Sequence, residues 1–188
     1  MATVKALTLS ILLCIPVWAW TIDFVPVATN GSVTVEKVSI PGPGSLGAPK
    51  MNVTANKTSS DWWHFDAVST IPRDETTVEI VFFNMGNLPT PHLLAVQVTG
   101  TFSNGSRFHK TAMAGDGATV TNDASGVRGQ WKGAGANFSS TPFEEPNLDF
   151  TINMDSPAIG VHGTFVLKAV STNGRLLTDI RSQATRGY

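Results

Sequence analysis

The sequence predicts an all-β protein, an antiparallel β-sandwich or barrel with few or no helices after residue 20. Three observations favour this fold class. Helical periodicity is hard to find after residue 20. Short runs rich in β-branched and aromatic residues recur instead. Clusters of Gly, Pro, Asn and Asp separate these runs about every 8–12 residues, as is typical of short antiparallel strands joined by turns.

The first three expected strands have the clearest patterns. Alternation in SVTVEKVSI predicts a strand over residues 32–40, which ends at PGPG, residues 41–44. The aromatic run DWWHFDAVST predicts a second strand over 61–70, closed by Pro72. TTVEIVFFNM predicts a third over 76–85, and it ends because the following loop GNLPTPH carries two prolines.

The later strands are expected to form hairpins. LLAVQVTGTF (93–102) returns through RFHKTAMA (107–114), because Asn104 and Gly105 tolerate positive φ and favour a two-residue turn. The polar stretch 47–60 is expected to be a loop. The remaining strands are expected at residues 118–122, 127–133, 148–155 and 161–171. This makes about eight or nine short strands, as in small sandwiches and barrels.

Length and charge favour one ordinary globular domain and exclude some partners. The chain has 188 residues, with 13 basic and 14 acidic side chains and no run of one sign. Nucleic-acid binding is not expected, because it needs clustered Lys and Arg. Hydrophobic residues make up 41% and charged residues 14% of the chain, which suits an uncharged surface or an apolar cavity and argues against disorder.

The first residues have the pattern of a secretory signal peptide. MATVK carries one positive charge, an apolar stretch follows, and Ala19 offers a small residue for cleavage. We therefore expect a signal peptide over 1–19 and a β domain over 20–188. The apolar run is too short to span a bilayer comfortably, so no stable membrane span is expected. Cys14 is the only cysteine, so the mature chain is expected to contain no thiol and no disulfide.

Asn-x-Ser/Thr sequons give a second signal for the same compartment. Each lies in a polar or Gly-rich context, as an exposed glycan requires. The expected glycosylation sites are Asn30, Asn52, Asn56, Asn104 and Asn137. Together with the N-terminus they predict that the chain enters the secretory pathway, to reside in the endoplasmic reticulum lumen, in vesicles or outside the cell.

Common catalytic motifs are absent from the sequence. No pair of histidines has metal-ligand spacing, and no phosphate-binding or nucleophile motif is present. The four histidines are His64, His92, His109 and His162. A glycosidase would need two positioned carboxylates. The sequence alone pairs none of the candidates, which are Asp61, Asp66, Glu79, Glu144 and Glu145. We expect no metal and no cofactor.

The stretch WWHFD stands out because aromatic and polar side chains lie side by side in it. On a strand, neighbouring side chains point to opposite faces. Trp62, His64 and Asp66 are therefore expected on one face. Trp63 and Phe65 are expected on the other, with Ala67. Either tryptophan can belong to the core or to a ligand-binding wall.

Glu79 is unusual because it lies among apolar residues in VEIVFF. A buried and unpaired carboxylate is costly, so Glu79 must face either solvent or a cavity. Alternation places Glu79, Val81 and Phe83 on one face of this strand. Both readings, an edge charge facing water and a cavity residue, remain open from the residues alone.

The segment WWHFDAVS resembles the WWYFDA-type signature of proteins related to hydroxyneurosporene synthase and the AttH proteins. With SVTVEKVSIPGPGS near the expected mature N-terminus and VEIVFFN after the signature, the layout is similar to that of the fungal Diels–Alderases. These act in polyketide–nonribosomal peptide pathways, and the cytochalasan-forming members look nearest. The resemblance covers most of residues 30–171. His64 stands where the signature has tyrosine.

The resemblance implies two lipocalin-like β domains with the substrate pocket at their junction. Such proteins are roughly twice as long as this chain, so it is expected to supply the N-terminal domain, with a second lipocalin-like domain as its partner. The implied activity is an intramolecular [4+2] cycloaddition of a linear polyketide–amino acid polyene, giving cytochalasan- or decalin-type products. It needs no cofactor, because an apolar pocket that folds a flexible polyene lowers the barrier by proximity.

The resemblance also directs the choice of site residues. Glu79 and His64 are the expected catalytic groups, since a hydrogen-bond donor on a conjugated carbonyl lowers the barrier further. The expected substrate-binding residues are Trp62, Trp63, Phe65, Phe83 and Asn84. Asp61 and Asp66 are expected to bond backbone or turn groups near the strand ends. Two alternatives remain: a secreted lipocalin-like carrier without turnover, and a hydratase or isomerase of isoprenoids.

Overall fold

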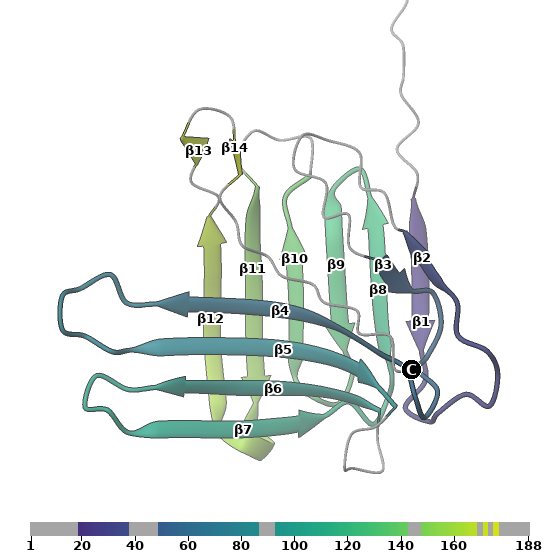
Figure 1. Cartoon of the computed structure of the whole chain (residues 1–188), viewed down its shortest axis with the longest axis horizontal. Helices are drawn as coiled ribbons and strands as arrows, with labels where there is room; N and C mark the ends of the chain where they lie inside the picture. Colours follow the sequence, from purple (N-terminus) through teal and green to yellow (C-terminus); the bar gives the residue numbers. More distant parts are fainter. Residues whose placement is uncertain are drawn as a thin grey trace, which may run out of the picture.

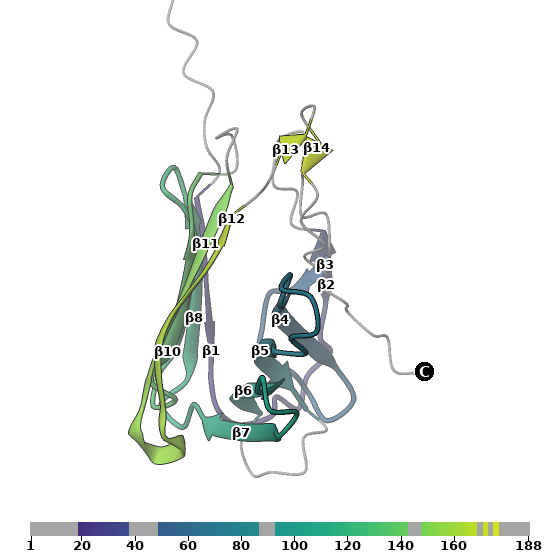
Figure 2. The same ribbon diagram turned by 90° about the vertical axis from the view of Figure 1, so that its left-hand side faces the viewer.

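The computed structural model describes residues 19–37, 49–86, 93–142, 148–168, 171–172 and 175–176. Two antiparallel sheets pack face to face, which confirms the all-β prediction (Figures 1 and 2). In the described residues the only helix is the short 3₁₀ turn η1, Pro157–Ile159. No helix of the described part is long and apolar enough to cross a membrane.

The larger sheet has six strands in the order β1-β8-β9-β10-β11-β12. From β8 to β12 each strand pairs with the next along the chain, so this part is a simple antiparallel meander. β1 adds at the far edge by pairing with β8. The bounds are β1 Trp20–Phe24, β8 Ala118–Asp123, β9 Gly126–Trp131, β10 Ala136–Ser140, β11 Asp149–Ser156 and β12 Val161–Lys168.

The smaller sheet is a second antiparallel meander, in the order β4-β5-β6-β7. Its strands are β4 Ser60–Val68, β5 Thr77–Met85, β6 Leu94–Thr101 and β7 Arg107–Met113. Two short ribbons complete the description: β2 Val35–Lys37 pairs with β3 Pro49–Met51, and β13 Ser171–Thr172 pairs with β14 Arg175–Leu176. In Figure 1 the strands of the smaller sheet run crosswise to those of the larger one, which is the orthogonal kind of sheet packing.

The core between the sheets centres on Phe138 of β10. Its ring lies 4.9 Å from that of Trp63, 5.3 Å from that of Phe65 and 5.1 Å from that of Phe82, measured between ring centroids. All four side chains are at most 7% exposed. Gly129 faces Phe138 in the register of β9 and β10, and a Cβ at position 129 would lie 2.2 Å from the Phe138 ring. The missing side chain makes room for the phenylalanine.

Most expected strands are present, and the differences follow from weak local signals. β1, β10 and β3 were not expected; β3 lies inside the stretch 47–60 that was predicted to be a loop. The 93–114 hairpin closes with three residues between Phe102 and Ser106, not two, because the Phe102 N–H donates to the Ser106 carbonyl. Some predictions lie outside the described residues: the signal peptide up to residue 18, the end of the first strand after residue 37, His92, Glu144 and Glu145.

Candidate functional site

The outer face of the four-stranded sheet gathers four of the predicted site residues. Alternate residues of β4 are buried, and in β5 the core side holds Ile80 and Phe82. Trp62 and His64 therefore point away from the core together with Glu79 and Phe83. The antiparallel register sets Trp62 directly opposite Phe83, and His64 two residue pairs further along, opposite Val81. Glu79 is two residues beyond Val81 on β5, so it meets His64 diagonally. An aromatic pair and a polar pair therefore lie next to each other on one face.

His64 and Glu79 form the polar pair. Nε2 of His64 lies 3.0 Å from Oε1 of Glu79, and the two side chains are 28% and 43% exposed. The other carboxylate oxygen, Oε2, accepts a hydrogen bond of 2.8 Å from the hydroxyl of Thr99 on β6. Glu79 is thus held from two sides, by strands that flank its own.

The contact between His64 and Glu79 is close but not aligned. Nε2 is buried and has no hydrogen-bond partner among the described residues, although Oε1 is at ion-pair distance. A ring N–H needs a near-linear N–H···O angle, so two atoms can be 3.0 Å apart without forming a hydrogen bond. The two side chains nevertheless place a nitrogen base next to a carboxylate on a partly buried face.

The surroundings of the pair are apolar on one side and polar on the other. Val81, opposite His64 in the register, is only 5% exposed, and Trp62 and Phe83 are half-buried. On the other side Asp66 is exposed and lies opposite Glu79 in the register. Among the residues that the structure describes, Asp66 has no hydrogen bond to a backbone or turn group that would match its expected role. An apolar molecule with one polar oxygen is the kind of ligand that fits such a surface.

Trp63 and Phe65 are on the opposite side of β4, inside the core. They are 7% and 1% exposed and pack against Phe138, whereas the sequence-based prediction offered them as walls of a substrate channel. Within the described residues they have no open space beside them. Their burial supports the outer residue, Trp62, as the tryptophan available to a ligand.

Asn84 is also engaged in the fold. It is 2% exposed, its Oδ1 accepts the N–H of Ala55 at 2.9 Å, and its Nδ2 donates to the carbonyl of Val53 at 3.2 Å. The side chain therefore holds the segment after β3 against the end of β5. It does not join the other site residues on the outer face.

Lys50 is a feature that the sequence reasoning missed. Its ammonium group is buried and donates to Oδ1 of Asp61 at 3.0 Å and to the carbonyl of Trp62 at 2.8 Å. It also lies 4.5 Å from the centre of the Trp63 ring, in a cation–π contact. Burial lowers the pKa of Lys50, and the carboxylate of Asp61 offsets part of that effect. A lysine between a proline and a methionine, in an otherwise uncharged stretch, was the only sequence signal.

Asp61 has the structural role that the sequence predicted. Its Oδ2 accepts the backbone N–H of Met51 at 3.1 Å, while Oδ1 pairs with Lys50. No group of three or more His, Cys, Asp or Glu side chains in the described residues is placed to hold a metal ion.

The five predicted glycosylation sites differ in exposure. Asn30, Asn104 and Asn137 are exposed, and Asn52 and Asn56 are half-buried. Asn56 is the most engaged by its neighbours, since Nδ2 donates to the carbonyl of Gly31 and Oδ1 accepts from Thr58. Asn104 lies in the β6–β7 turn, where its Oδ1 accepts from Ser106.

Comparison with known proteins finds one matching family model and two similar fungal proteins. A family model described as Diels-Alderase-like matches residues 27–179. The chain is 40% identical over 147 residues to the quinolone epoxide rearrangement protein asqO of Emericella nidulans, a match that covers 76% of this chain and 38% of that protein. It is 32% identical over 162 residues to the quinolone epoxide rearrangement protein penF of Penicillium thymicola, covering 84% and 44%. The chain thus spans about two fifths of the length of these relatives.

Proposed function

Because this chain belongs to the Diels–Alderase-like family, we propose that it is part of a secondary-metabolite enzyme that isomerises an apolar small molecule. The reaction is an intramolecular cyclisation or rearrangement, carried out without a cofactor. The outer face of the four-stranded sheet holds the molecule, with Trp62 and Phe83 as the apolar wall. The His64–Glu79 pair donates a hydrogen bond or a proton.

Two reactions fit this description. The first is the intramolecular [4+2] cycloaddition of a linear polyketide–amino acid polyene, leading to cytochalasan- or decalin-type products. Two C–C σ bonds form as three π bonds become one, and no atom is gained or lost. The second is the rearrangement of an epoxide, which the printed names of both relatives favour. There the pair protonates the epoxide oxygen and the C–O bond breaks. A nucleophilic X–H group of the same molecule forms a bond to the freed carbon, its X–H bond breaks, and that proton returns to the pair, so no atom is gained or lost.

Both reactions have the same two physical requirements. A flexible chain must be held in a reactive geometry, which can supply about 7–11 kcal/mol of the barrier in favourable intramolecular cases. An oxygen that gains negative charge must receive a hydrogen bond or proton, in a setting drier than bulk water. The observation that carries the proposal is the 3.0 Å contact between His64 and Glu79, on the same face as the Trp62–Phe83 pair and beginning two residues from it along β4.

We also propose that the protein enters the secretory pathway. The predicted signal peptide and the five sequons support entry to the secretory pathway, and occupancy of any of the five asparagines would support it directly. A non-catalytic carrier is the main rival function, and it predicts that the bound molecule is recovered unchanged. An isoprenoid hydratase would give a product that is heavier than its substrate by one water molecule, whereas an isomerase product has the mass of its substrate.

Gene deletion followed by metabolite profiling tests the activity. We expect an uncyclised polyene or an unrearranged epoxide to accumulate, with the same mass as the missing product. Reintroducing Glu79→Gln at the native locus should lower product formation by about 10²–10⁴-fold, the usual range for losing a general acid or base. His64→Gln should behave alike, because either change breaks the pair.

The matched control is Glu75→Gln, the same chemical change at an exposed residue of the β4–β5 connection. It should leave product formation unchanged. A deletion strain with an unaltered metabolite profile would reject the proposed activity. Normal product formation by both site variants would instead reject the site while leaving the activity in place.

A further inference from the structure

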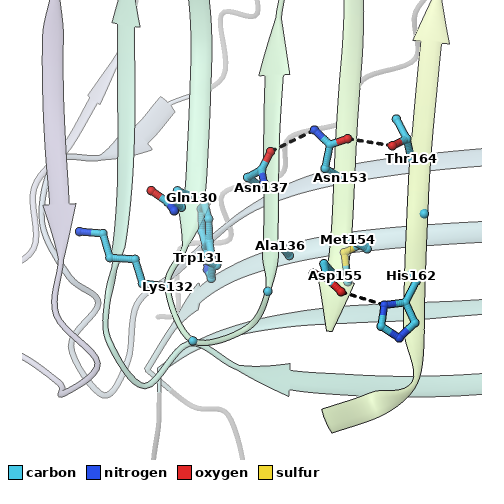
Figure 3. A pocket seen from close by; sticks show the side chains of 13 residues that line it. Gln130, Trp131, Lys132, Ala136, Asn137, Asn153, Met154, Asp155, His162 and Thr164 are labelled. Atoms are coloured by element: carbon cyan, nitrogen blue, oxygen red, sulfur yellow. Dashed lines mark hydrogen bonds and ion pairs between the residues drawn. The ribbon is translucent and has the colours of Figure 1, made fainter. Parts of the chain in front are cut away.

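A concave surface lies on the outer face of the six-stranded sheet, and Figure 3 shows the side chains that line it. This sheet is the layer opposite the four-stranded sheet that carries the proposed active face (Figure 2). The concave surface is an open groove of about 530 Å³ over β9 to β12. We call it the amide groove, after the side chains of its central row. That row is Gln130, Asn137, Asn153 and Thr164. None of these residues takes part in the proposed reaction.

The register explains why the row is continuous. Gln130 lies opposite Asn137, Asn137 opposite Asn153, and Asn153 opposite Thr164, so the four side chains cross four strands in one line. Neighbouring strands are about 4.8 Å apart, so the row is roughly 14 Å long. Small residues open the space beside it: a Cβ added at Gly163 would meet nothing within 4 Å. The groove is thus long enough for two linked sugar rings.

The hydrogen bonds along the row fix the orientation of the Asn137 amide. Thr164 donates to Oδ1 of Asn153 at 2.9 Å, and Nδ2 of Asn153 donates to Oδ1 of Asn137 at 3.2 Å (Figure 3). The carbonyl oxygen of Asn137 is therefore occupied and its orientation is set. Its Nδ2 group, which carries the two N–H donors, is left for a ligand or a modification.

The charges of the groove disfavour an ionic ligand. Asp155 and His162 pair with each other, with Oδ1 and Nδ1 2.9 Å apart. Lys132 extends away from the amide side chains (Figure 3). Besides these three side chains, the polar lining consists of the neutral donors and acceptors of the amide row, which match the many hydroxyl and acetamido groups of a saccharide.

We propose that the amide groove binds an N-acetylated saccharide, and that its occupant is the first part of a glycan carried by Asn137. Asn137-Phe138-Ser139 is a sequon, and Asn137 is exposed in the middle of the row. In the attachment step Nδ2 of Asn137 forms a bond to C1 of a sugar delivered as a glycosyl diphosphate. The bond from C1 to the diphosphate oxygen breaks, and one amide proton leaves. The carbonyl oxygen keeps its bond to Asn153.

This role distinguishes Asn137 from the other sequons. Asn104 sits in an exposed turn, so a glycan there would extend into solvent. A glycan at Asn137 would lie along the sheet, with its hydroxyl and acetamido groups against Gln130 and Thr164. The proposal rests on entry to the secretory pathway and is independent of the catalytic activity.

Glycan mapping on the full chain, secreted from yeast, tests the proposal. We expect Asn137 to be occupied. Its glycan should be released by an endoglycosidase from the native protein at least tenfold more slowly than the glycan of Asn104, because the groove shields the first sugars. In the double variant Asn153→Ala/Thr164→Val, release from Asn137 should accelerate to the rate at Asn104. A thermal melt of each variant shows whether it is folded.

A second experiment distinguishes a glycan attached to Asn137 from a free saccharide as the ligand of the amide groove. Unglycosylated chain from bacteria is titrated with N,N′-diacetylchitobiose by calorimetry, and weak binding that the double variant lacks is expected. An unoccupied Asn137 beside an occupied Asn104 would overturn the proposal, and so would equal release rates at the two sites. If chitobiose binds but Asn137 carries no glycan, the groove binds a free saccharide. That result would overturn the proposal that the groove holds a glycan attached to Asn137. Five unoccupied sequons would overturn it too.

Discussion

Lys50 connects a short ribbon to the strand that carries the candidate site. Its ammonium bonds the carbonyl of Trp62 and the carboxylate of Asp61, so β3 is tied to the backbone of β4 where the outer tryptophan projects. Moving a charge out of water is costly, and the fold accepts this cost only because three partners surround the ammonium. The third partner is the face of Trp63. The position of Trp62 therefore depends on a residue that has no contact with a ligand.

Replacing this lysine tests its role. Lys50→Met should lower the free energy of unfolding by about 3–5 kcal/mol, because it leaves the carboxylate of Asp61 buried without its partner. Urea denaturation at neutral pH measures the change. The double variant Lys50→Met/Asp61→Asn should recover part of the loss. Lys110→Met, at an exposed site on β7, serves as the control and should change stability little.

The difference in stability between the wild type and Lys50→Met should change with pH in a defined direction. Burial lowers the pKa of Lys50 below its ordinary value of 10.5, so between the lowered pKa and 10.5 the unfolded chain holds more protons at this position than the folded chain. The stability advantage of the wild type over Lys50→Met should therefore rise with pH across that window. Below the window it should be constant. An advantage that falls as pH approaches 10.5 would contradict this account.

At the scale of the elements, the pairing of β9 and β10 depends on one missing side chain. Gly129→Ala would place a Cβ 2.2 Å from the ring of Phe138 at the centre of the core. We expect a loss of about 1–3 kcal/mol in the free energy of unfolding, as for other overpacked cores. Gly115→Ala is the matched control, because a Cβ there meets nothing within 4 Å. Equal stabilities of the two variants in urea denaturation would show that Phe138 can move aside.

Sequence patterns predicted the elements well where alternation is strong. In β4 and β5 a period of two told which residues share a face. The burial of alternate residues confirms this grouping in β4, whereas in β5 Val81 is buried although it lies on the outer face. β1 and β10 are only five residues long, and β3 only three, so their alternation was too brief to recognise. Those strands form because neighbours in the sheet supply their hydrogen bonds, which no local pattern records.

The site could be predicted in part, for a related reason. Alternation brought Trp62 and His64 to one face of β4, and Glu79 and Phe83 to one face of β5, but it left open which face is the core. Whether His64 meets Glu79 depends on the register of the two strands, which the connection at residues 69–76 sets. Trp63, Phe65 and Asn84 were placed at the site from the signature alone. The packing of the second sheet, and the segment after β3, explain their burial.

At the scale of the whole molecule, two sheets enclose one aromatic core and present two different outer faces. One face carries the aromatic pair and the His64–Glu79 pair, and the other carries the amide groove. Membership of the Diels–Alderase-like family is confirmed, whereas the link to cytochalasan pathways remains a prediction. The matched region is about two fifths of the length of each of these relatives, so the activity remains a proposal.

The central claim is that the outer face of the four-stranded sheet shapes the substrate, and Trp62 tests it most directly. Product formation and stereochemistry are compared between strains carrying Trp62→Ala and Phe102→Ala, the latter an exposed aromatic at the opposite end of the same sheet. A thermal melt confirms that both variants fold. We expect Trp62→Ala to lose most of the product or its single stereochemistry, and Phe102→Ala to keep both. Full yield and unchanged stereochemistry with Trp62→Ala would contradict the account.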